Sequence, residues 1–230
     1  MTEIKTKDVT FAANGGEGTG YLAQPDDAGR HPGVIVIQEW WGLDGHIKSI
    51  ADRFAREGFV ALAPDMYHGA VATEPDEARK LVMGLNRERA LTDLLGTVSY
   101  LQGLPEVGPK KLGCIGFCMG GALTLALAAA STDLAAGAPF YGGFGPGPEG
   151  LAKIEAELFC AFGADDGGMP VEKVREFEGT LRDLGKKAVV KVYEGAPHSF
   201  FNDTKESYRP EAAQDAWERA LDLFRRTLGS

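Results

Sequence analysis

Hydrophobic positions along most of the chain follow two alternating patterns. Short continuous apolar runs indicate strands covered on both faces of a sheet, and apolar residues every three or four positions indicate amphipathic helices. Strands are predicted at 33–38, 59–65, 110–117, 134–139, 157–163 and 188–195. Helices are predicted at 45–58, across 74–104 with a break near Asn86, at 119–130, at 170–185 and at the C-terminus. One face of that last helix holds Trp217, Leu221, Phe224 and Leu228.

The first residues have a different pattern, in which polar and apolar residues alternate. Segments 4–11 and 18–25 are separated by glycines at 15, 16 and 18, which predicts an antiparallel hairpin at one end of the sheet. Beyond the hairpin, strands alternate with helices, as expected of a mostly parallel sheet with helices on both faces. We therefore predict one α/β domain over residues 1–230, with a sheet of about eight strands.

Composition and charge narrow the possible partners. The 230 residues are 44% hydrophobic, enough for one sizeable core, and the net charge is -9 with no basic cluster. We therefore expect neither nucleic acid nor an anionic membrane as a partner. The start "MTEIKTKDV" lacks the apolar core of a signal peptide, and no apolar run could span a bilayer.

The three cysteines narrow the chemistry further. Their spacing fits neither a disulfide framework nor a zinc site, so no metal is expected. A reducing, cytoplasmic location suits such free thiols. Cys114 and Cys160 lie inside apolar strands, where a thiol is an inert small hydrophobe.

Cys118 is different because it lies where a predicted strand meets a predicted helix. Residues Gly116 to Gly120 have the pattern Gly-x-Cys-x-Gly, which is the nucleophile elbow with cysteine in place of serine. The glycines give room for a strained turn that displays the nucleophile at a helix N-terminus, where a thiolate and an oxyanion are favoured. The alternative is that Cys118 is a small hydrophobe in a glycine-rich turn.

A thiol nucleophile needs a base and a group that orients the base. Elbow hydrolases supply an acid and then a histidine from loops after later strands. His198 is the only histidine after Cys118, and it follows the last predicted strand. Asp165 and Asp166 follow the strand before it, and their positions alone do not separate them. His31, His46 and His68 precede Cys118 and so fit this chain order less well, although His68 could line a pocket.

An acyl-transfer site also needs an oxyanion hole. One donor would be the backbone N–H of Met119, directly after the nucleophile. The second is expected after the first buried strand, where Glu39, Trp40 and Trp41 follow one another. We expect Trp40 to donate its N–H while Glu39 faces the thiol. The alternative is a solvated glutamate beside two packed tryptophans.

Together these residues resemble a known family. The segments "QEWWG", "APDMY", "GFCMGG", "PFYGG", "FGADDGGMP" and "YEGAPHSF" resemble, in order and spacing, those of the bacterial dienelactone hydrolases, which are cysteine members of the α/β-hydrolase superfamily. The resemblance covers nearly the whole chain. It implies an α/β-hydrolase fold and ester or lactone hydrolysis, without a cofactor.

The resemblance also implies roles for individual residues. It implies Cys118 as nucleophile and His198 as base, and it favours Asp166 as the acid because this aspartate lies four residues before the proline of its segment. Glu39 resembles the carboxylate that holds or activates the thiol in the family. By the same matching, the oxyanion donors are Trp40 and Met119, and Tyr141 is a pocket tyrosine.

One departure from the family concerns the charge of the substrate. In the dienelactone hydrolases that this chain resembles, arginines bind a carboxylate of the substrate. The matching positions here are Asn202 and Pro75, with Arg79 one turn further on. Without an arginine that can bind a carboxylate through two hydrogen bonds, an anionic substrate has no matching cation in the pocket. We therefore expect small neutral esters or lactones, in a pocket bordered by Trp40, Trp41, Phe200, Phe201 and Asn202.

Two other functions follow from the same residues. The Cys118 thiolate would be a soft nucleophile in a pocket without arginines to bind a substrate carboxylate. Such a site is also suited to neutral phosphate triesters. A non-catalytic binding protein or a redox sensor would instead show a broken triad or a second cysteine placed to resolve an oxidised thiol. Cys114 lies in the strand and is poorly placed to resolve Cys118.

Overall fold

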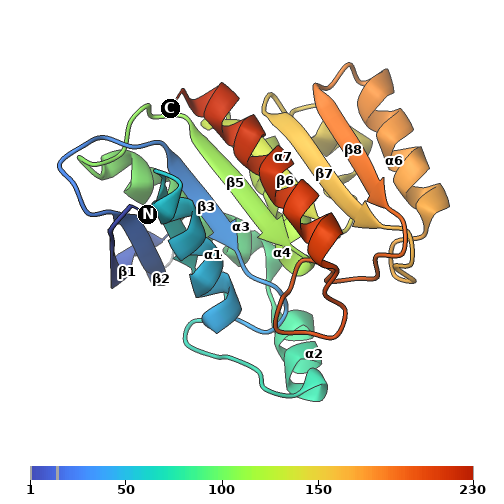
Figure 1. Ribbon diagram of the computed structural model, residues 1–230, viewed down its shortest axis with the longest axis horizontal. Helices are drawn as coiled ribbons and strands as arrows, with labels where there is room; N and C mark the ends of the chain where they lie inside the picture. Colours follow the sequence, from blue (N-terminus) through green and yellow to red (C-terminus); the bar gives the residue numbers. More distant parts are fainter. Residues whose placement is uncertain (1, 14–15, 230) are drawn as a thin grey trace.

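The computed structural model describes residues 2–13 and 16–229, and within them the chain forms one sheet of eight strands (Figure 1). The strands lie in the order β1-β2-β4-β3-β5-β6-β7-β8. β1 and β2 form an antiparallel hairpin, β2 pairs antiparallel with β4, and the remaining pairs are parallel. The strands are β1 Ile4–Ala13, β2 Gly16–Pro25, β3 Gly33–Ile37, β4 Val60–Pro64, β5 Leu112–Phe117, β6 Leu134–Phe140, β7 Glu157–Gly163 and β8 Ala188–Tyr193.

The helices follow the predicted order with small differences at their ends, except that the short helix α5 was not predicted. They are α1 Gly45–Arg56, α2 Pro75–Gly84, α3 Arg87–Gly103, α4 Met119–Ala130, α5 Gly147–Leu151, α6 Val171–Asp183 and α7 Pro210–Leu228. The predicted break near Asn86 is confirmed, because the Asn86 side chain caps α3 by accepting from the N–H of Arg89 at 3.0 Å.

Two boundaries near the strands differ from the prediction. β6 continues one residue past Pro139, to Phe140. β2 begins at Gly16, so Gly16 and Gly18 pair with β1 and do not form the turn. The predicted turn glycine at position 15 lies outside the described residues.

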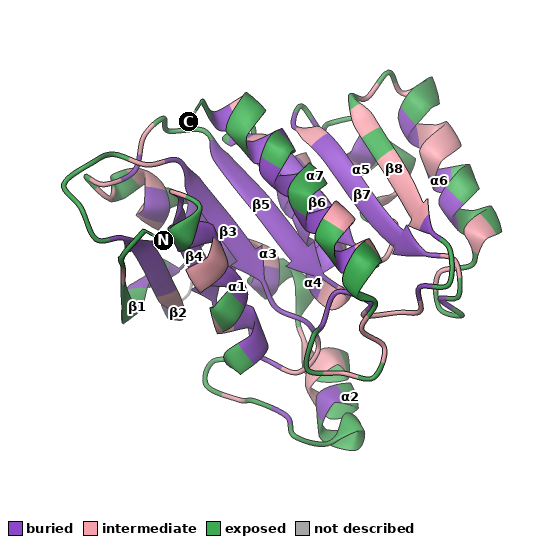
Figure 2. Cartoon of the chain, viewed as in Figure 1, coloured by how far each residue is buried: buried purple, intermediate pink, exposed green. Residues whose placement is uncertain are grey.

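Helices cover both faces of the sheet. On one face α1 packs on β2, β3 and β4, and α7 packs on β5, β6 and β7, around a core that contains Phe54, Phe117 and Phe224. On the other face α3, α4 and α6 enclose a second apolar core that contains Leu94, Leu123 and Phe177. The central strands are therefore buried on both sides, as Figure 2 shows.

The parallel strands all point the same way, so their carboxyl ends meet at one edge of the sheet. The chain leaves β3 toward Glu39, β5 toward Cys118, β6 toward Tyr141, β7 toward Asp166 and β8 toward His198. Ligands of open α/β sheets bind outside this edge. The topology therefore brings together loops that are far apart in the sequence.

Candidate active site

The turn between β5 and α4 holds Cys118 in a strained conformation, with φ 54° and ψ -114°. A Cβ added at Gly116 would lie 2.1 Å from the carbonyl oxygen of Gly120, and one added at Gly120 would lie 2.5 Å from that of Ile37. Glycine is therefore required on both sides of the cysteine, as the sequence pattern predicted. The N–H of Cys118 donates to the carbonyl of Phe140 at 3.0 Å, which anchors the turn to the end of β6.

A cavity of about 340 Å³ lies above this turn and is lined by both Cys118 and His198. His198 Nδ1 lies 2.6 Å from Asp166 Oδ2. Asp166 is itself held because its other oxygen accepts from the backbone N–H groups of Gly168 and Met169. The neighbouring Asp165 makes no such contact with the imidazole. The three residues of the expected triad therefore lie together, with Asp166 as the aspartate that reaches the histidine.

The charges in this group stabilise one another. Burial opposes a charged imidazole, but the hydrogen bond with Asp166 and the interaction with Cys118 outweigh it and raise the pKa of His198 to about 10. Burial also opposes the charge of Asp166, but the hydrogen bond from His198 and those from the backbone hold its pKa below the ordinary value. The arrangement therefore favours the imidazolium form of His198 beside the Asp166 carboxylate.

We expect the Asp166→Asn substitution to lower the pKa of His198, measured by NMR titration of the imidazole, by at least about one unit. Because the folded pKa of about 10 lies above the ordinary 6.5, the pairing stabilises the fold fully below pH 6.5 and this contribution is lost as pH rises toward 10. The difference in Tm between wild type and variant should shrink over the same window. A wild-type His198 pKa near 6.5 would contradict the arrangement.

The backbone N–H groups of Met119, the first residue of α4, and of Trp40, in the loop after β3, have no acceptor in the described part of the chain. The side chains of Trp40 and Trp41 pack edge to face, with ring centroids 5.2 Å apart, and both residues line the cavity. Free N–H groups from these two loops are what an oxyanion hole requires.

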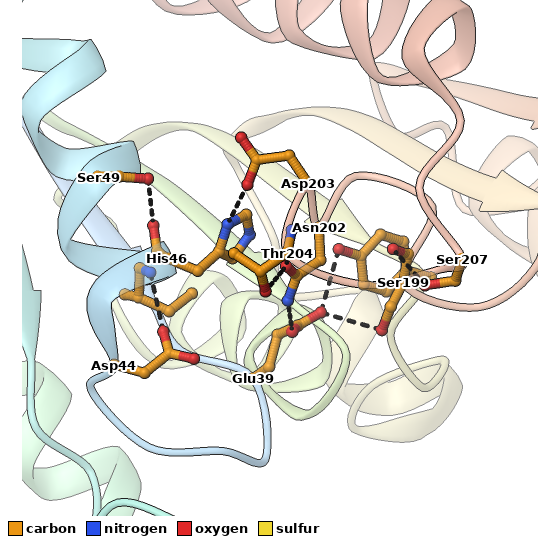
Figure 3. A network of polar contacts seen from close by, with 11 residues as sticks. Glu39, Asp44, His46, Ser49, Ser199, Asn202, Asp203, Thr204 and Ser207 are labelled. Atoms are coloured by element: carbon orange, nitrogen blue, oxygen red, sulfur yellow. Dashed lines mark hydrogen bonds and ion pairs between the residues drawn. The ribbon is translucent and has the colours of Figure 1, made fainter. Parts of the chain in front are cut away.

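Glu39 is almost fully buried, with 1% of its surface exposed, and its carboxylate is surrounded by donors (Figure 3). Its Oε1 accepts from the hydroxyls of Ser199 at 3.0 Å and Tyr141 at 3.2 Å. Its Oε2 accepts from Asn202 Nδ2 at 2.7 Å. Within the described residues, no hydrogen bond joins Glu39 to Cys118. Its hydrogen bonds therefore lead to Tyr141 after β6 and to the loop after β8.

The residues expected to line the pocket divide into two groups. Trp40 and Trp41 line the cavity, whereas Tyr141, Phe200 and Asn202 are buried and do not. The Tyr141 ring packs edge to face on His198, at 5.2 Å between centroids, and Phe200 stacks on Phe140 in the core. Phe201 is likewise buried, against Phe117. Among the described residues, the aromatic side chains from the predicted pocket border that line the cavity are thus the two tryptophans.

The cavity also contains residues that sequence reasoning missed, namely Ser199, Lys205 and Ser207. Lys205 places its Nζ 3.8 Å from the centre of the Trp41 ring, a cation–π contact. These residues belong to the irregular segment between β8 and α7, which has no hydrophobic period. The only available signal was their closeness in sequence to His198.

The other two cysteines are buried away from the cavity. Burial raises the pKa of the Cys114 thiol to about 12, and burial also raises that of Cys160. The Cys114 Sγ donates to the hydroxyl of Thr124. A thiol that is protonated and enclosed cannot act as a nucleophile, which leaves Cys118 as the reactive candidate.

The remaining histidines make contacts elsewhere. His31 pairs with Asp27, and His46 pairs with Asp203. His68 pairs with Asp93 and lines a separate cavity next to α2 and α3. Among residues 2–13 and 16–229, no group of three or more His, Cys, Asp and Glu side chains is arranged to hold a metal ion. Every helix in these ranges is too short or too polar to span a bilayer.

Comparison with known proteins yields one consistent family. The sequence pattern of the dienelactone hydrolase family matches residues 19–228. Protein usf of Aquifex pyrophilus is 40% identical over 96% of this chain and 98% of its own length. A protein of Synechocystis sp., provisionally named a carboxymethylenebutenolidase, is 36% identical over 98% of both chains.

A solved structure is similar over the same extent. It is a dienelactone hydrolase-like promiscuous phosphotriesterase from metagenomic libraries. Its TM-score is 0.90 at 27% identity, and the match covers 98% of this chain and 99% of that one. The similarity therefore extends from the first hairpin to the closing helix.

Proposed function

We propose a reaction for this chain from one premise, which is that it belongs to the dienelactone hydrolase family and is a hydrolase acting on esters or lactones. The proposed reaction uses Cys118 as nucleophile, His198 as general base and acid, and Asp166 as the residue that orients the imidazole. The observation that supports it most is the 2.6 Å contact between His198 and Asp166 beside an elbow cysteine in the same cavity.

In the first half of the reaction, the Cys118 thiolate attacks the carbonyl carbon of the ester. The backbone N–H groups of Trp40 and Met119 donate to the oxyanion that develops. When the tetrahedral intermediate collapses, the imidazolium of His198 gives its proton to the departing alkoxide, and the acyl group stays on sulfur as a thioester.

In the second half, neutral His198 takes a proton from water, which attacks the thioester. The acid product leaves and Cys118 is again a thiolate beside an imidazolium. Asp166 keeps the imidazole in the same orientation throughout and remains ionised. No step needs a metal or a cofactor.

We propose small neutral esters or lactones as substrates. Asn202 is buried and bonded to Glu39, and Arg79 is exposed on α2 and pairs with Asp76, so neither offers a cation to the cavity. The cation that does line the cavity, Lys205, lies over Trp41. Turnover in a reducing cytoplasm, where the thiol stays free, is part of the same proposal.

The proposal is tested with a panel of p-nitrophenyl acetate, p-nitrophenyl butyrate, the matched p-nitrophenyl hemisuccinate, and neutral and carboxylate-bearing lactones. We expect higher kcat/KM for the neutral member of each pair, and an acyl adduct on the Cys118 peptide in mass spectra of quenched reactions. A strong preference for the acidic members, lost in Lys205→Met, would overturn the neutral-substrate proposal and make Lys205 an anion-binding residue. Absence of turnover across the panel would overturn the function itself.

Neutral phosphate triesters are a second candidate substrate class. The observation that favours them is the similarity to a promiscuous phosphotriesterase, together with a thiolate in a cavity without an arginine among its lining residues. Paraoxon belongs in the same panel for this reason. Turnover that depends on Cys118 would support this activity, and turnover that is absent or independent of Cys118 would exclude it.

A further inference from the structure

The Glu39 carboxylate is buried, and its hydrogen-bond donors among the described residues are all neutral. These donors come from two loops: Tyr141 follows β6, while Ser199 and Asn202, labelled in Figure 3, follow β8. Burying a carboxylate is costly unless hydrogen bonds replace its hydration. Three such bonds, one of them 2.7 Å long, provide that replacement here. Glu39 is therefore held in a specific position by the loop that contains the proposed base.

The orientation of Asn202 is determined by its other neighbour. Its Oδ1 accepts from the backbone N–H of Thr204 at 3.0 Å and from the Thr204 hydroxyl at 2.7 Å. The amide can satisfy these two donors only with its oxygen, so its Nδ2 group must face Glu39. Asn202 is fully buried, which makes each of these contacts costly to lose.

Backbone strain occurs at the same contacts. Tyr141 has φ 38° and Ser199 has φ 60°, although side chains rarely adopt positive φ. Both hydroxyls donate to the same oxygen of Glu39. Strain of this kind persists only where surrounding contacts compensate for it, and it is concentrated at functional sites.

The two loops joined by these contacts hold opposite halves of the proposed reaction. Glu39 immediately precedes Trp40, whose N–H is a proposed oxyanion donor, and Ser199 immediately follows His198. A shift of the Glu39 carboxylate would therefore change the position of the imidazole relative to the oxyanion hole. A displacement of about 1 Å in such an arrangement can cost about 10²-fold in rate.

We propose that Glu39 and Asn202 are positioning residues, which act together to hold the His198 loop against the Trp40 loop. Asn202 thus has a role at the matching position where the family uses a substrate-binding cation. This inference rests on the proposed function for its catalytic consequence, but the arrangement can also be tested without substrate.

The test exchanges donor and acceptor between the two residues. Asn202→Asp keeps the shape of the side chain and both contacts with Thr204. It replaces the Nδ2 donor with a carboxylate oxygen that faces the Glu39 carboxylate. Glu39→Gln with Asn202→Asp restores a hydrogen bond, because the new glutamine amide donates to the new aspartate while its oxygen still accepts from Tyr141 and Ser199. The double variant therefore keeps the buried charge and all donors paired, but moves the charge to position 202.

We expect Asn202→Asp to lower kcat for p-nitrophenyl acetate by about 10- to 100-fold with little change in KM. The double variant should recover to within about threefold of wild type, as expected of coupled neighbours. Should the single variant not fold, the comparison of the double variant with wild type decides the matter. A double variant that folds but stays as slow as Asn202→Asp, or a single variant with wild-type kcat, would overturn the proposal.

The readout without substrate is the rate of Cys118 alkylation by iodoacetamide as a function of pH. A displaced imidazole stabilises the thiolate less, so the alkylation midpoint should rise by about one pH unit in Asn202→Asp and return in the double variant. This result would stand even if no ester were hydrolysed. An alkylation midpoint that stays shifted in the double variant would contradict the proposal.

Asp203→Asn is the matched control. It replaces an acid with an amide at the next residue, the reverse of the change at position 202. The Asp203 carboxylate is half exposed and lies 3.1 Å from His46 Nδ1, and it makes no hydrogen bond to Glu39. We expect its kcat and alkylation midpoint to equal those of wild type. Equal effects at 202 and 203 would show that any charge change in this loop disturbs the site, which contradicts a specific role for the Glu39 contact.

Discussion

Cys118→Ala is expected to lower kcat/KM for p-nitrophenyl acetate by at least about 10³-fold. The substitution removes the proposed nucleophile, and the remaining groups can only orient water and stabilise an oxyanion. It adds no atoms to the strained elbow, and Cys118 is only partly buried, so the fold should persist. Steady-state kinetics with matched circular dichroism spectra would measure both properties.

Cys160→Ala is the appropriate control for this loss. It removes a thiol of the same size from the middle of β7, where the side chain is fully buried and its pKa is raised. We expect activity within about twofold of wild type and a fall in stability of about 1 kcal/mol from the lost packing. Full esterase activity in Cys118→Ala, or a comparable loss in Cys160→Ala, would refute the assignment of the nucleophile.

Gly120→Ala is expected to lower the free energy of unfolding by about 3 kcal/mol. It should also abolish most of the esterase activity of the wild type. The added Cβ would lie 2.5 Å from the carbonyl oxygen of Ile37 and 2.6 Å from that of Gln38. Both are backbone atoms at the end of β3 and cannot rotate away. The β3 end must therefore move, and the loop that begins there contains Glu39 and Trp40.

Gly103→Ala tests whether this effect is specific to the elbow. Gly103 is the last residue of α3, has ordinary φ, and would place a Cβ in open space. Replacing it should change stability by less than about 1 kcal/mol, in the stabilising direction, because alanine restricts the unfolded chain. Urea unfolding of the two variants measures the difference. Equal stabilities would contradict the close approach of α4 to β3.

Much of the fold could be predicted from local patterns. Continuous apolar runs predicted the buried strands because a parallel sheet covered on both faces has no polar side. The break at Asn86 was predictable because an asparagine that caps a helix accepts a hydrogen bond from a backbone N–H of the first turn, here that of Arg89. The helix-strand order then implied the common edge of the sheet at which the loops containing Cys118, Asp166 and His198 meet.

The candidate site was only partly predictable. Position alone did not separate Asp165 from Asp166, although the family resemblance favoured the residue that bonds to His198. Asn202 and Phe200 were expected at the pocket, and both are instead buried below it. Lys205 was not expected, and it lines the cavity. All of these positions lie in irregular segments, where no period indicates the direction of a side chain.

By itself, the sequence determined the order of strands and helices and the turn that displays Cys118, because apolar periodicity and the absence of a Cβ are local properties of the chain. Only the tertiary structure decided what Glu39 touches. Its bond to Asn202 joins residues 163 positions apart, and its bond to Ser199 depends on a backbone φ of 60° that serine does not prefer. Contacts of this kind exist only after the sheet has brought the two loops together, so no local pattern could reveal them.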